Sequence, residues 1–160
     1  MKELILVAGL PGVGKSTLAR KIAQEKNGLV LDLDDFKKIV VDPKLVTEQI
    51  DPPQVRWSYY NLAINHALTL EAEVVVMDEV FHLADLRHKI EVICKDRDVE
   101  IQWIEVVCDY LVVKKRLSQK NRDGHILSSE QTLKMYLLFR QIFESFSNGK
   151  PNHVVINNND

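Results

Sequence analysis

The chain has 160 residues, a length that suits one compact domain with a single core. Hydrophobic residues make up 46% of the sequence and charged residues 28%, a balance that excludes an intrinsically disordered chain. The formal net charge of −2 argues against a protein dedicated to nucleic acid, and no apolar run reaches the roughly 18 residues of a membrane span. We expect a single domain over residues 1–160, located in the cytoplasm and without a membrane partner.

Apolar runs alternate with helix-length periodic segments along the whole chain. The short run Leu4–Ala8 is typical of a strand that is buried on both faces of a parallel sheet. Four further strands are predicted at Leu29–Leu33, Val74–Met77, Ile101–Val107 and His153–Ile156. Helices are predicted at about Ser16–Glu25, Pro53–Leu70, Ala84–Cys94, Tyr110–Lys120 and Ser128–Phe146, the last with Ser128 or Ser129 as its N-cap.

This alternation of strands and helices predicts an α/β fold. Right-handed crossovers then produce an open parallel sheet of five strands with helices on both faces. Ligands of such sheets bind at the carboxyl ends of the strands, so residues that directly follow a strand are the first candidates for chemistry.

A phosphate-binding motif follows the first strand. Residues 9–16 match G-x-x-x-x-G-K-[ST] at every specified position, between a strand and a helix. Backbone N–H groups of such a loop, together with the positive end of the helix dipole, bind phosphate oxygens. Lys15 then reaches the β- and γ-phosphates, Ser16 offers its hydroxyl to Mg²⁺, and Thr17 contacts the α-phosphate. The predicted ligands are ATP and Mg²⁺, and the predicted nucleotide-binding residues are Gly9, Leu10, Pro11, Gly12, Val13, Gly14, Lys15, Ser16 and Thr17.

Two acidic residues end the third predicted strand. Asp78 is the predicted second protein ligand of Mg²⁺. The alternative is that Asp78 only caps the segment after the strand, where Asp is common. Glu79 either aligns a water molecule, as in ATPases, or is a solvated neighbour.

Further acids follow the second predicted strand. Strand alternation puts Asp32 and Asp34 on one side, so one of them is expected to face the phosphates. A carboxylate there can accept the proton of an attacking hydroxyl group. The alternative is that Asp34 or Asp35 is the N-cap of a short helix through Val40.

A basic segment follows the fourth predicted strand. It contains Lys114, Lys115, Arg116, Lys120 and Arg122 without an intervening acid. We interpret residues 114–128 as a lid that brings guanidinium groups to the transferred phosphate and excludes water. The alternative is a solvated basic face of a helix.

The residues between the second and third strands are the predicted source of acceptor contacts. Their aromatic side chains can stack on a base or line an apolar pocket. However, Trp57, Tyr60 and Ile64 recur at helical spacing, and we interpret them as core residues. Cys94 and Cys108 lie in apolar segments without the spacing of a metal site, so they are expected to be reduced core residues.

These motifs resemble the small P-loop kinases typified by 5′-hydroxyl polynucleotide kinases, with chloramphenicol phosphotransferases and zeta-toxin-like kinases as relatives. The specific part of the resemblance covers residues 4–20, and it extends through Asp34-Asp35-Phe36-Lys37 to the lid and the Met135-Tyr136 helix. The segment Val74–Phe81, followed by Arg87, resembles the antibiotic phosphotransferases as much. The resemblance implies a P-loop NTPase fold of nucleoside-kinase type with a mobile lid.

The resemblance also implies roles for single residues. It selects Asp34 as the catalytic base and gives Arg116 and Arg122 phosphate contacts, beside Lys15. Lys37 stands where polynucleotide kinases carry an arginine, and lysine does not reproduce the bidentate fork of arginine on a phosphate.

The sequence therefore predicts an AAA-type ATP-dependent kinase that moves the γ-phosphate of Mg-ATP onto a hydroxyl group of a small-molecule or nucleoside acceptor. The alternatives are a polynucleotide 5′-hydroxyl kinase that acts on RNA or DNA ends, and a nucleotide-dependent regulatory ATPase. The protein is expected to be a monomer or a homodimer.

Overall fold

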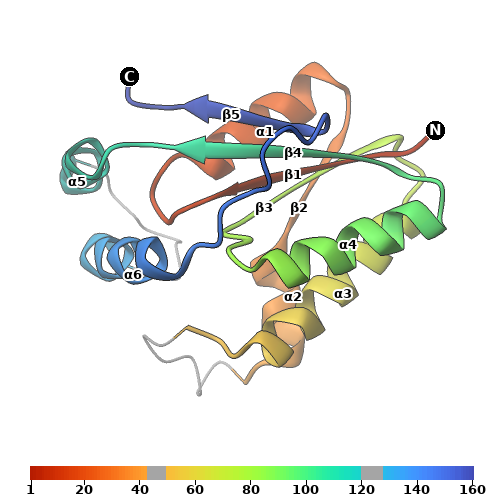
Figure 1. Cartoon of the computed structure of the whole chain (residues 1–160), viewed down its shortest axis with the longest axis horizontal. Coiled ribbons are helices and arrows are strands. Elements are labelled where there is room, and N and C mark those ends of the chain that lie inside the picture. Colours follow the sequence, from red (N-terminus) through yellow and green to blue (C-terminus); the bar gives the residue numbers. More distant parts are fainter. Residues whose placement is uncertain (43–49, 120–127) are drawn as a thin grey trace.

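The computed structural model describes residues 1–42, 50–119 and 128–160, which build one sheet of five parallel strands with flanking helices (Figure 1). The strand order is β2-β3-β1-β4-β5. The strands are β1 (Glu3–Gly9), β2 (Leu29–Asp32), β3 (Val74–Glu79), β4 (Glu100–Val107) and β5 (His153–Asn157). The predicted α/β fold with a five-stranded parallel sheet is therefore confirmed.

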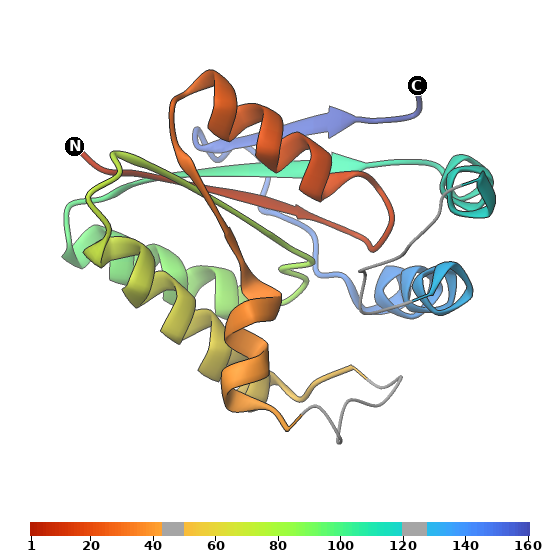
Figure 2. The same cartoon turned by 180° about the vertical axis from the view of Figure 1, so that it is seen from behind.

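Six helices are present among the described residues. They are α1 (Lys15–Glu25), α2 (Leu33–Val40), α3 (Pro53–Thr69), α4 (Ala84–Asp96), α5 (Tyr110–Gln119) and α6 (Ser129–Ile142). Helix α1 covers one face of the sheet, and α3 and α4 cover the other (Figures 1 and 2). Helices α5 and α6 lie beyond the carboxyl ends of the strands (Figure 1). In the described ranges, no helix has the length and apolarity needed to cross a membrane.

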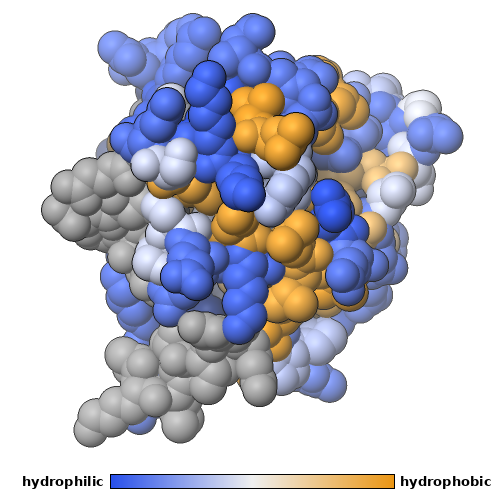
Figure 3. Space-filling model, turned by 90° about the vertical axis from the view of Figure 1, so that its left-hand side faces the viewer, coloured by the Kyte–Doolittle hydropathy of each residue, from blue (hydrophilic) through white to orange (hydrophobic). Residues whose placement is uncertain are grey.

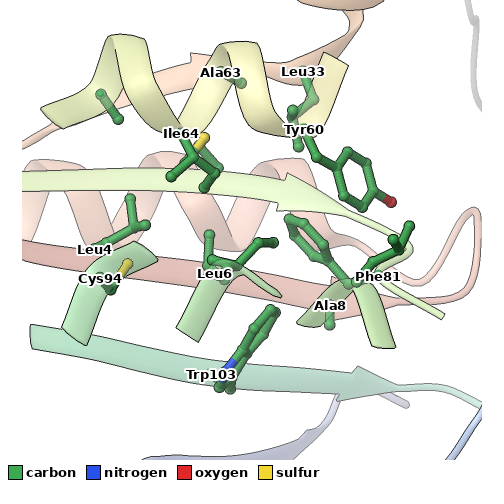
Figure 4. Close-up of a cluster of buried hydrophobic side chains, with 14 of the residues drawn as sticks. Leu4, Leu6, Ala8, Leu33, Tyr60, Ala63, Ile64, Phe81, Cys94 and Trp103 are labelled. Atoms are coloured by element: carbon green, nitrogen blue, oxygen red, sulfur yellow. The ribbon is translucent and has the colours of Figure 1, made fainter. Parts of the chain in front are cut away.

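The core consists of two main apolar layers, one on each side of β1. Alternate residues of β1 point to opposite layers because successive side chains of a strand leave opposite faces. Leu4 and Leu6 pack in the layer under α3 and α4, next to Trp103 (Figure 4), whereas Ile5 and Val7 pack in the layer under α1. All four β1 side chains are at most 1% exposed, as expected for a strand buried on both faces.

The predicted helix Ser128–Phe146 is too long at its C-terminal end, because α6 stops at Ile142. The residues after it are held in a different conformation by Arg87, whose guanidinium donates to the carbonyl oxygens of Glu144 (2.8 Å) and Ser145 (3.1 Å). Phe146 is buried against the core and is not on the helix. Long-range contacts thus override the helical pattern of the sequence at this point.

The start of α6 agrees with the sequence. Ser128 is the N-cap, and its side chain accepts a hydrogen bond from the backbone N–H of Gln131 (3.2 Å). The side chain of Gln131 accepts one in return from the backbone N–H of Ser128 (2.9 Å). This reciprocal capping box satisfies two backbone donors that the helix itself leaves free.

Both cysteines are buried free thiols, as predicted. Cys94 on α4 is inaccessible to solvent, and burial raises the pKa of its thiol to about 11. Cys108 directly follows β4 and is 9% exposed, and burial also raises the pKa of its thiol. Because the thiolate is the reactive form, both residues are unreactive in the native fold.

Candidate active site

The loop between β1 and α1 has the geometry of a phosphate cradle. Gly14, the N-cap of α1, has φ 97°, a left-handed conformation that glycine adopts without steric cost. A Cβ atom on Gly9 would lie only 2.5 Å from the carbonyl oxygen of Val106, so that position also requires glycine. Lys15 extends back across the loop, and its Nζ donates to the carbonyl oxygen of Leu10 at 2.9 Å. The N-terminal N–H groups of α1 and the Lys15 ammonium group thus lie at the same loop, an arrangement typical of phosphate-binding sites.

Ser16 and Asp78, the two residues predicted to bind Mg²⁺, lie side by side. The two residues come from α1 and β3, and Ser16 Oγ donates to Asp78 Oδ2 at 2.9 Å. Burial raises the pKa of Asp78, whereas the charge of Lys15 and the hydrogen bond from Ser16 act in the opposite direction. A hydroxyl and a carboxylate side by side fit Mg²⁺, which prefers oxygen ligands and completes its shell with substrate phosphates and water. The described residues contain no cluster of three or more His, Cys, Asp or Glu side chains able to hold a metal unaided.

The turn from β2 to α2 corrects two expectations about the acids at this point. The strand ends at Asp32, and Leu33 already begins α2, so strand alternation does not orient Asp34. Asp32 is the N-cap of this helix, since its Oδ1 accepts from the backbone N–H of Asp34 at 2.9 Å. The expectation that Asp34 or Asp35 is the cap is therefore wrong. Asp32 is engaged by the backbone, and the carboxylate of Asp34 serves no capping role.

Asp34 is half-buried in the first turn of α2, beside the Mg²⁺ ligand pair. The pairing of β2 with β3 sets Asp32 opposite Asp78, which brings the start of α2 to the end of β3. Burial raises the pKa of Asp34 to about 6, and the charges of Glu79, Asp32 and Asp78 add to the shift against the charge of Lys37. A carboxylate with a pKa near neutrality is suited to accept a proton at physiological pH.

Arg56 on α3 is a site residue that sequence analysis missed. It is only 4% exposed, and its Nη1 lies 3.5 Å from Glu79 Oε1. The same atom donates to the hydroxyl oxygen of Tyr60 at 3.3 Å, and the guanidinium lies over the rings of Tyr59, Tyr60 and Phe139. A signal was present in the sequence: the helical period of Tyr60 and Ile64 places Arg56 on the same buried helix face.

Glu79 is therefore not the solvated neighbour that the sequence left open. Its side chain is 16% exposed, and its Oε1 accepts from the backbone N–H of Val80 at 2.8 Å. The interpretation of the nearby aromatic face as core is confirmed for Tyr60 and Ile64, each 1% exposed. Trp57 is half-buried and packs against the edge of that core.

A second ion pair ties α2 to the start of α3. Lys37 Nζ lies 2.7 Å from Asp51 Oδ2, and the hydroxyl of Tyr59 donates to the same oxygen at 3.0 Å. We call the set of polar residues on this side of the P-loop the acceptor-side cluster. It comprises Asp34, Lys37, Asp51, Arg56, Tyr59, Tyr60 and Glu79.

Part of this region is built at a cost in stability. In the described part of the chain, the buried side-chain atoms Arg56 Nε and His82 Nδ1 have no hydrogen-bond partner. Burial and the charges of Arg56 and Arg87 lower the pKa of His82 to about 4, so this imidazole is neutral at pH 7. Each unsatisfied buried polar atom costs roughly 1–3 kcal/mol. Phe81, which follows β3, has φ 50°, a strained conformation for a residue with a side chain.

Arg116 lies on the other side of the P-loop, against the C-terminal segment. Its Nη2 donates to the carbonyl oxygens of Asn158 (2.6 Å) and Asp160, and its Nη1 lies 3.5 Å from Cys108 Sγ. The Asn158 side chain in turn donates to the carbonyl oxygen of Val13 at 2.8 Å, so this segment braces the P-loop. Lys114 and Lys115, also predicted as part of the lid, lie on α5, whereas Lys120 and Arg122 lie outside the described residues.

A cavity of about 260 Å³ opens at the root of the P-loop. It is lined by Gly9, Leu10, Val13, Glu105, Val106, Val107, Cys108, Tyr136, Arg140 and Phe143. Its walls come from the P-loop, the end of β4 and α6, and they do not include the acceptor-side cluster. Figure 3 shows the molecule from the end at which the strands finish, where hydrophilic residues surround a smaller hydrophobic area.

Comparison with known families and structures agrees with this arrangement. The family model of an AAA domain matches residues 4–142, and the chain therefore belongs to this AAA domain family. A comparison with curated protein sequences gives no match.

Solved structures with the same fold include three kinases. A gluconokinase from Sinorhizobium meliloti 1021 is 18% identical, with a TM-score of 0.70 over 98% of this chain and 82% of that chain. A sugar kinase from Janibacter sp. HTCC2649 is 16% identical, with a TM-score of 0.71 over 98% and 86% of the two chains. A shikimate kinase from Bacteroides thetaiotaomicron is 15% identical, with a TM-score of 0.56 over 87% and 78%. At these identities the likeness establishes the fold, which is that of the small P-loop kinases.

Proposed function

We propose that this protein is an ATP-dependent kinase that transfers the γ-phosphate of Mg-ATP to a hydroxyl group of a small-molecule acceptor. One observation carries the proposal: a half-buried carboxylate, Asp34, whose pKa is raised to about 6, stands beside the Ser16–Asp78 pair at the mouth of the P-loop. A hydroxyl acceptor needs such a base, whereas binding and release of a nucleotide does not.

The proposed mechanism assigns one task to each group. The P-loop N–H groups and Lys15 bind the phosphates, while Ser16 and Asp78 would hold Mg²⁺, which would neutralise part of the phosphate charge. Asp34 accepts the proton of the acceptor hydroxyl, and the hydroxyl oxygen forms a bond to the γ-phosphorus. The bond from that phosphorus to the β–γ bridging oxygen breaks, and ADP leaves with the electron pair.

The charges of the acceptor-side cluster support a small acceptor over a nucleic acid end. Lys37, which stands at the position of the polynucleotide kinase arginine, is paired with Asp51 at 2.7 Å. Arg56 is buried and paired with Glu79. Both basic side chains thus form ion pairs with acidic residues of this protein. They are therefore poorly placed to bind the phosphates of a nucleic acid. The structural neighbours also include proteins described as a gluconokinase, a sugar kinase and a shikimate kinase.

An acceptor screen with labelled ATP tests the proposal. The screen contains sugar acids, polyols, nucleosides, aminoglycosides, chloramphenicol and oligonucleotides with 5′-hydroxyl ends. We expect a phosphorylated small molecule that is formed by the parent protein and lost in both Lys15→Ala and Asp34→Asn.

Two results contradict the proposal. A labelled oligonucleotide as the sole product establishes the polynucleotide kinase instead. Hydrolysis of ATP without a phosphorylated product, at a rate that Asp34→Asn leaves unchanged, establishes the regulatory ATPase.

A further inference from the structure

We propose that Glu79 is a second acceptor-binding carboxylate and that the acceptor is a polyol with two neighbouring hydroxyl groups, one held by Asp34 and one by Glu79. This inference rests on the kinase function proposed above and specifies its substrate class. The residue next to a Mg²⁺ ligand thereby gains a role in acceptor recognition, with Arg56 as the residue that positions it.

The sheet brings the two carboxylates to the same place. Strands β2 and β3 are neighbours, with Asp32 opposite Asp78. Asp34 follows Asp32 by two residues on one strand end, and Glu79 directly follows Asp78 on the other. Among charged groups, Glu79 raises the pKa of Asp34 most, which agrees with the placement of both carboxylates at this end of the sheet.

Glu79 is held in one orientation by the protein. Its Oε1 accepts from the backbone N–H of Val80 at 2.8 Å and lies 3.5 Å from Arg56 Nη1. A carboxylate has about four lone-pair sites on its two oxygens. These two protein contacts therefore leave Glu79 with capacity to accept a further hydrogen bond, and its 16% exposure shows that the side chain reaches the protein surface.

Arg56 holds the Glu79 side chain in place. It is buried under the rings of Tyr59, Tyr60 and Phe139, and the Tyr60 hydroxyl fixes the same nitrogen that faces Glu79. A buried ion pair is costly to build, and apolar residues of similar volume often give equal or greater stability. The need to hold the Glu79 carboxylate in one position for a ligand explains why this site contains the pair.

Two carboxylates at one end of the sheet select the chemistry of the acceptor. A carboxylate is an acceptor of hydrogen bonds only, so each of them needs a donor from the ligand. Two neighbouring hydroxyl groups supply one donor each: the first transfers its proton to Asp34 during attack, and the second donates to Glu79 throughout. An anionic group on the carbons next to the attacking hydroxyl would be repelled by both acids.

Matched alcohols test this inference directly. The probes are three pairs with equal carbon skeletons: glycerol and 1-propanol, xylitol and 1-pentanol, and myo-inositol and cyclohexanol. Because a hydrogen bond to a charged group contributes about 1.5–3 kcal/mol, we expect kcat/KM for at least one polyol to exceed that of its partner by about 10- to 100-fold.

Substitutions test whether Glu79 is responsible for the preference for the polyol over the matched mono-alcohol. Glu79→Gln should raise KM for the preferred polyol by roughly 10-fold, change kcat little, and reduce the preference over the matched mono-alcohol. Arg56→Met should have the same effect on KM, and Arg56→Lys should restore part of it, which a purely structural role of Arg56 does not require. Glu91→Gln is the matched control, because Glu91 is similarly buried but pairs with Lys150 at 3.0 Å. Thermal unfolding verifies that each variant is folded.

The outcomes separate this inference from the proposed function. Equal kcat/KM within every pair, or a preference that Glu79→Gln leaves unchanged, overturns the polyol inference while Lys15-dependent transfer leaves the kinase function intact. Transfer to chloramphenicol, whose two hydroxyl groups are not on neighbouring carbons, but to none of the six alcohols also overturns it. Absence of transfer to any compound of the acceptor screen overturns the kinase function and this inference together.

Discussion

The two halves of the candidate active site are built from different material. In the proposed function, the P-loop binds through backbone N–H groups, and the steric freedom of glycines such as Gly14 lets those groups converge. The acceptor-side cluster would bind through side chains that come from α2, α3 and the end of β3, among them Asp34, Arg56 and Glu79. One half is a single stretch of chain, and the other exists only after three elements have packed together.

Because of this difference, we expect the two halves to have different binding specificities. A site made of backbone atoms recognises what every ATP molecule presents, and side-chain substitutions around it change its specificity little. A site made of packed side chains is specific for one acceptor, but it buries charges and leaves polar atoms such as His82 Nδ1 without partners. We therefore expect P-loop variants to reduce ATP binding and to reduce transfer to every acceptor alike. Variants of the acceptor-side cluster should change which acceptors are phosphorylated and should also change the free energy of unfolding.

The largest effect is expected for Lys15→Ala in the P-loop half. Loss of a charge that contacts the transferred phosphate should reduce transfer to any acceptor on the order of 10³-fold and weaken Mg-ATP binding sharply. Calorimetry measures the affinity and labelled ATP the transfer. Lys21→Ala is the control, because Lys21 is an exposed residue of α1 with 70% of its side chain accessible. If Lys15→Ala retains parental affinity and turnover, the P-loop half is wrongly assigned.

The next largest effect is expected for Asp34→Asn in the cluster half. Transfer should fall by roughly 10²-fold or more because the base is lost, while ATP affinity persists because Ser16 and Asp78 are unchanged. The same substitution should raise the free energy of unfolding at pH 7 by about 1–2 kcal/mol. The pKa of Asp34 is raised from 3.8 to about 6 on folding, so stability falls as pH rises through that window and stays lower above it.

Asp35→Asn controls for this experiment, since the Asp35 side chain is 71% exposed and should affect neither activity nor stability. Unchanged turnover in Asp34→Asn with a confirmed acceptor rejects Asp34 as the base.

The two halves of the site should differ in how the quantities they control, kcat and nucleotide affinity, depend on pH. The base is active when deprotonated, so kcat should decline as pH falls through about 6, by tenfold for each further pH unit. Affinity for the nucleotide should lack this limb, because the P-loop half binds through backbone groups and Lys15. Steady-state kinetics from pH 5 to 8 measure both, and a kcat that stays flat over this range contradicts the tuned carboxylate.

The smallest effect is expected for Asn158→Ala, which removes the side chain that braces the P-loop. One lost hydrogen bond of about 1 kcal/mol corresponds to roughly fivefold weaker ATP binding, because Asn158 Nδ2 donates to the carbonyl oxygen of Val13. The KM of the acceptor should not change, since this contact lies away from the acceptor-side cluster. Asn65→Ala on the exposed surface of α3 is the control, and a changed acceptor KM in Asn158→Ala indicates that the two halves are coupled.

The prediction of the P-loop half names single residues, because a backbone site requires glycines at fixed spacing within one short stretch of chain. The predicted partners Ser16 and Asp78 do lie in contact, since a P-loop hydroxyl and an acid at the end of a neighbouring parallel strand meet at the same edge of the sheet. The sheet itself followed from the alternation of apolar runs such as Leu4–Ala8, which only burial on two faces explains.

The acceptor-side cluster could be predicted only in part because its contacts join distant segments. Asp34 was identified, but Asp32 rather than Asp34 or Asp35 caps α2, a choice that depends on where β2 stops. Arg56 was missed because an arginine on an apolar helix face signals function only when its partner, Glu79 on β3, is known. The placement of Arg116 against Asn158 likewise depends on a contact across 42 residues of sequence.

The labelling rates of the two buried thiols can be used to measure how often parts of the fold open. Cys94 lies at the centre of the layer under α3 and α4 and is inaccessible, so a thiol reagent reaches it only through global unfolding. Cys108 lies at the end of β4 beside Arg116 and the C-terminal segment, where a local opening exposes it. The ratio of the two labelling rates therefore measures how often the brace behind the P-loop detaches while the rest of the fold remains intact.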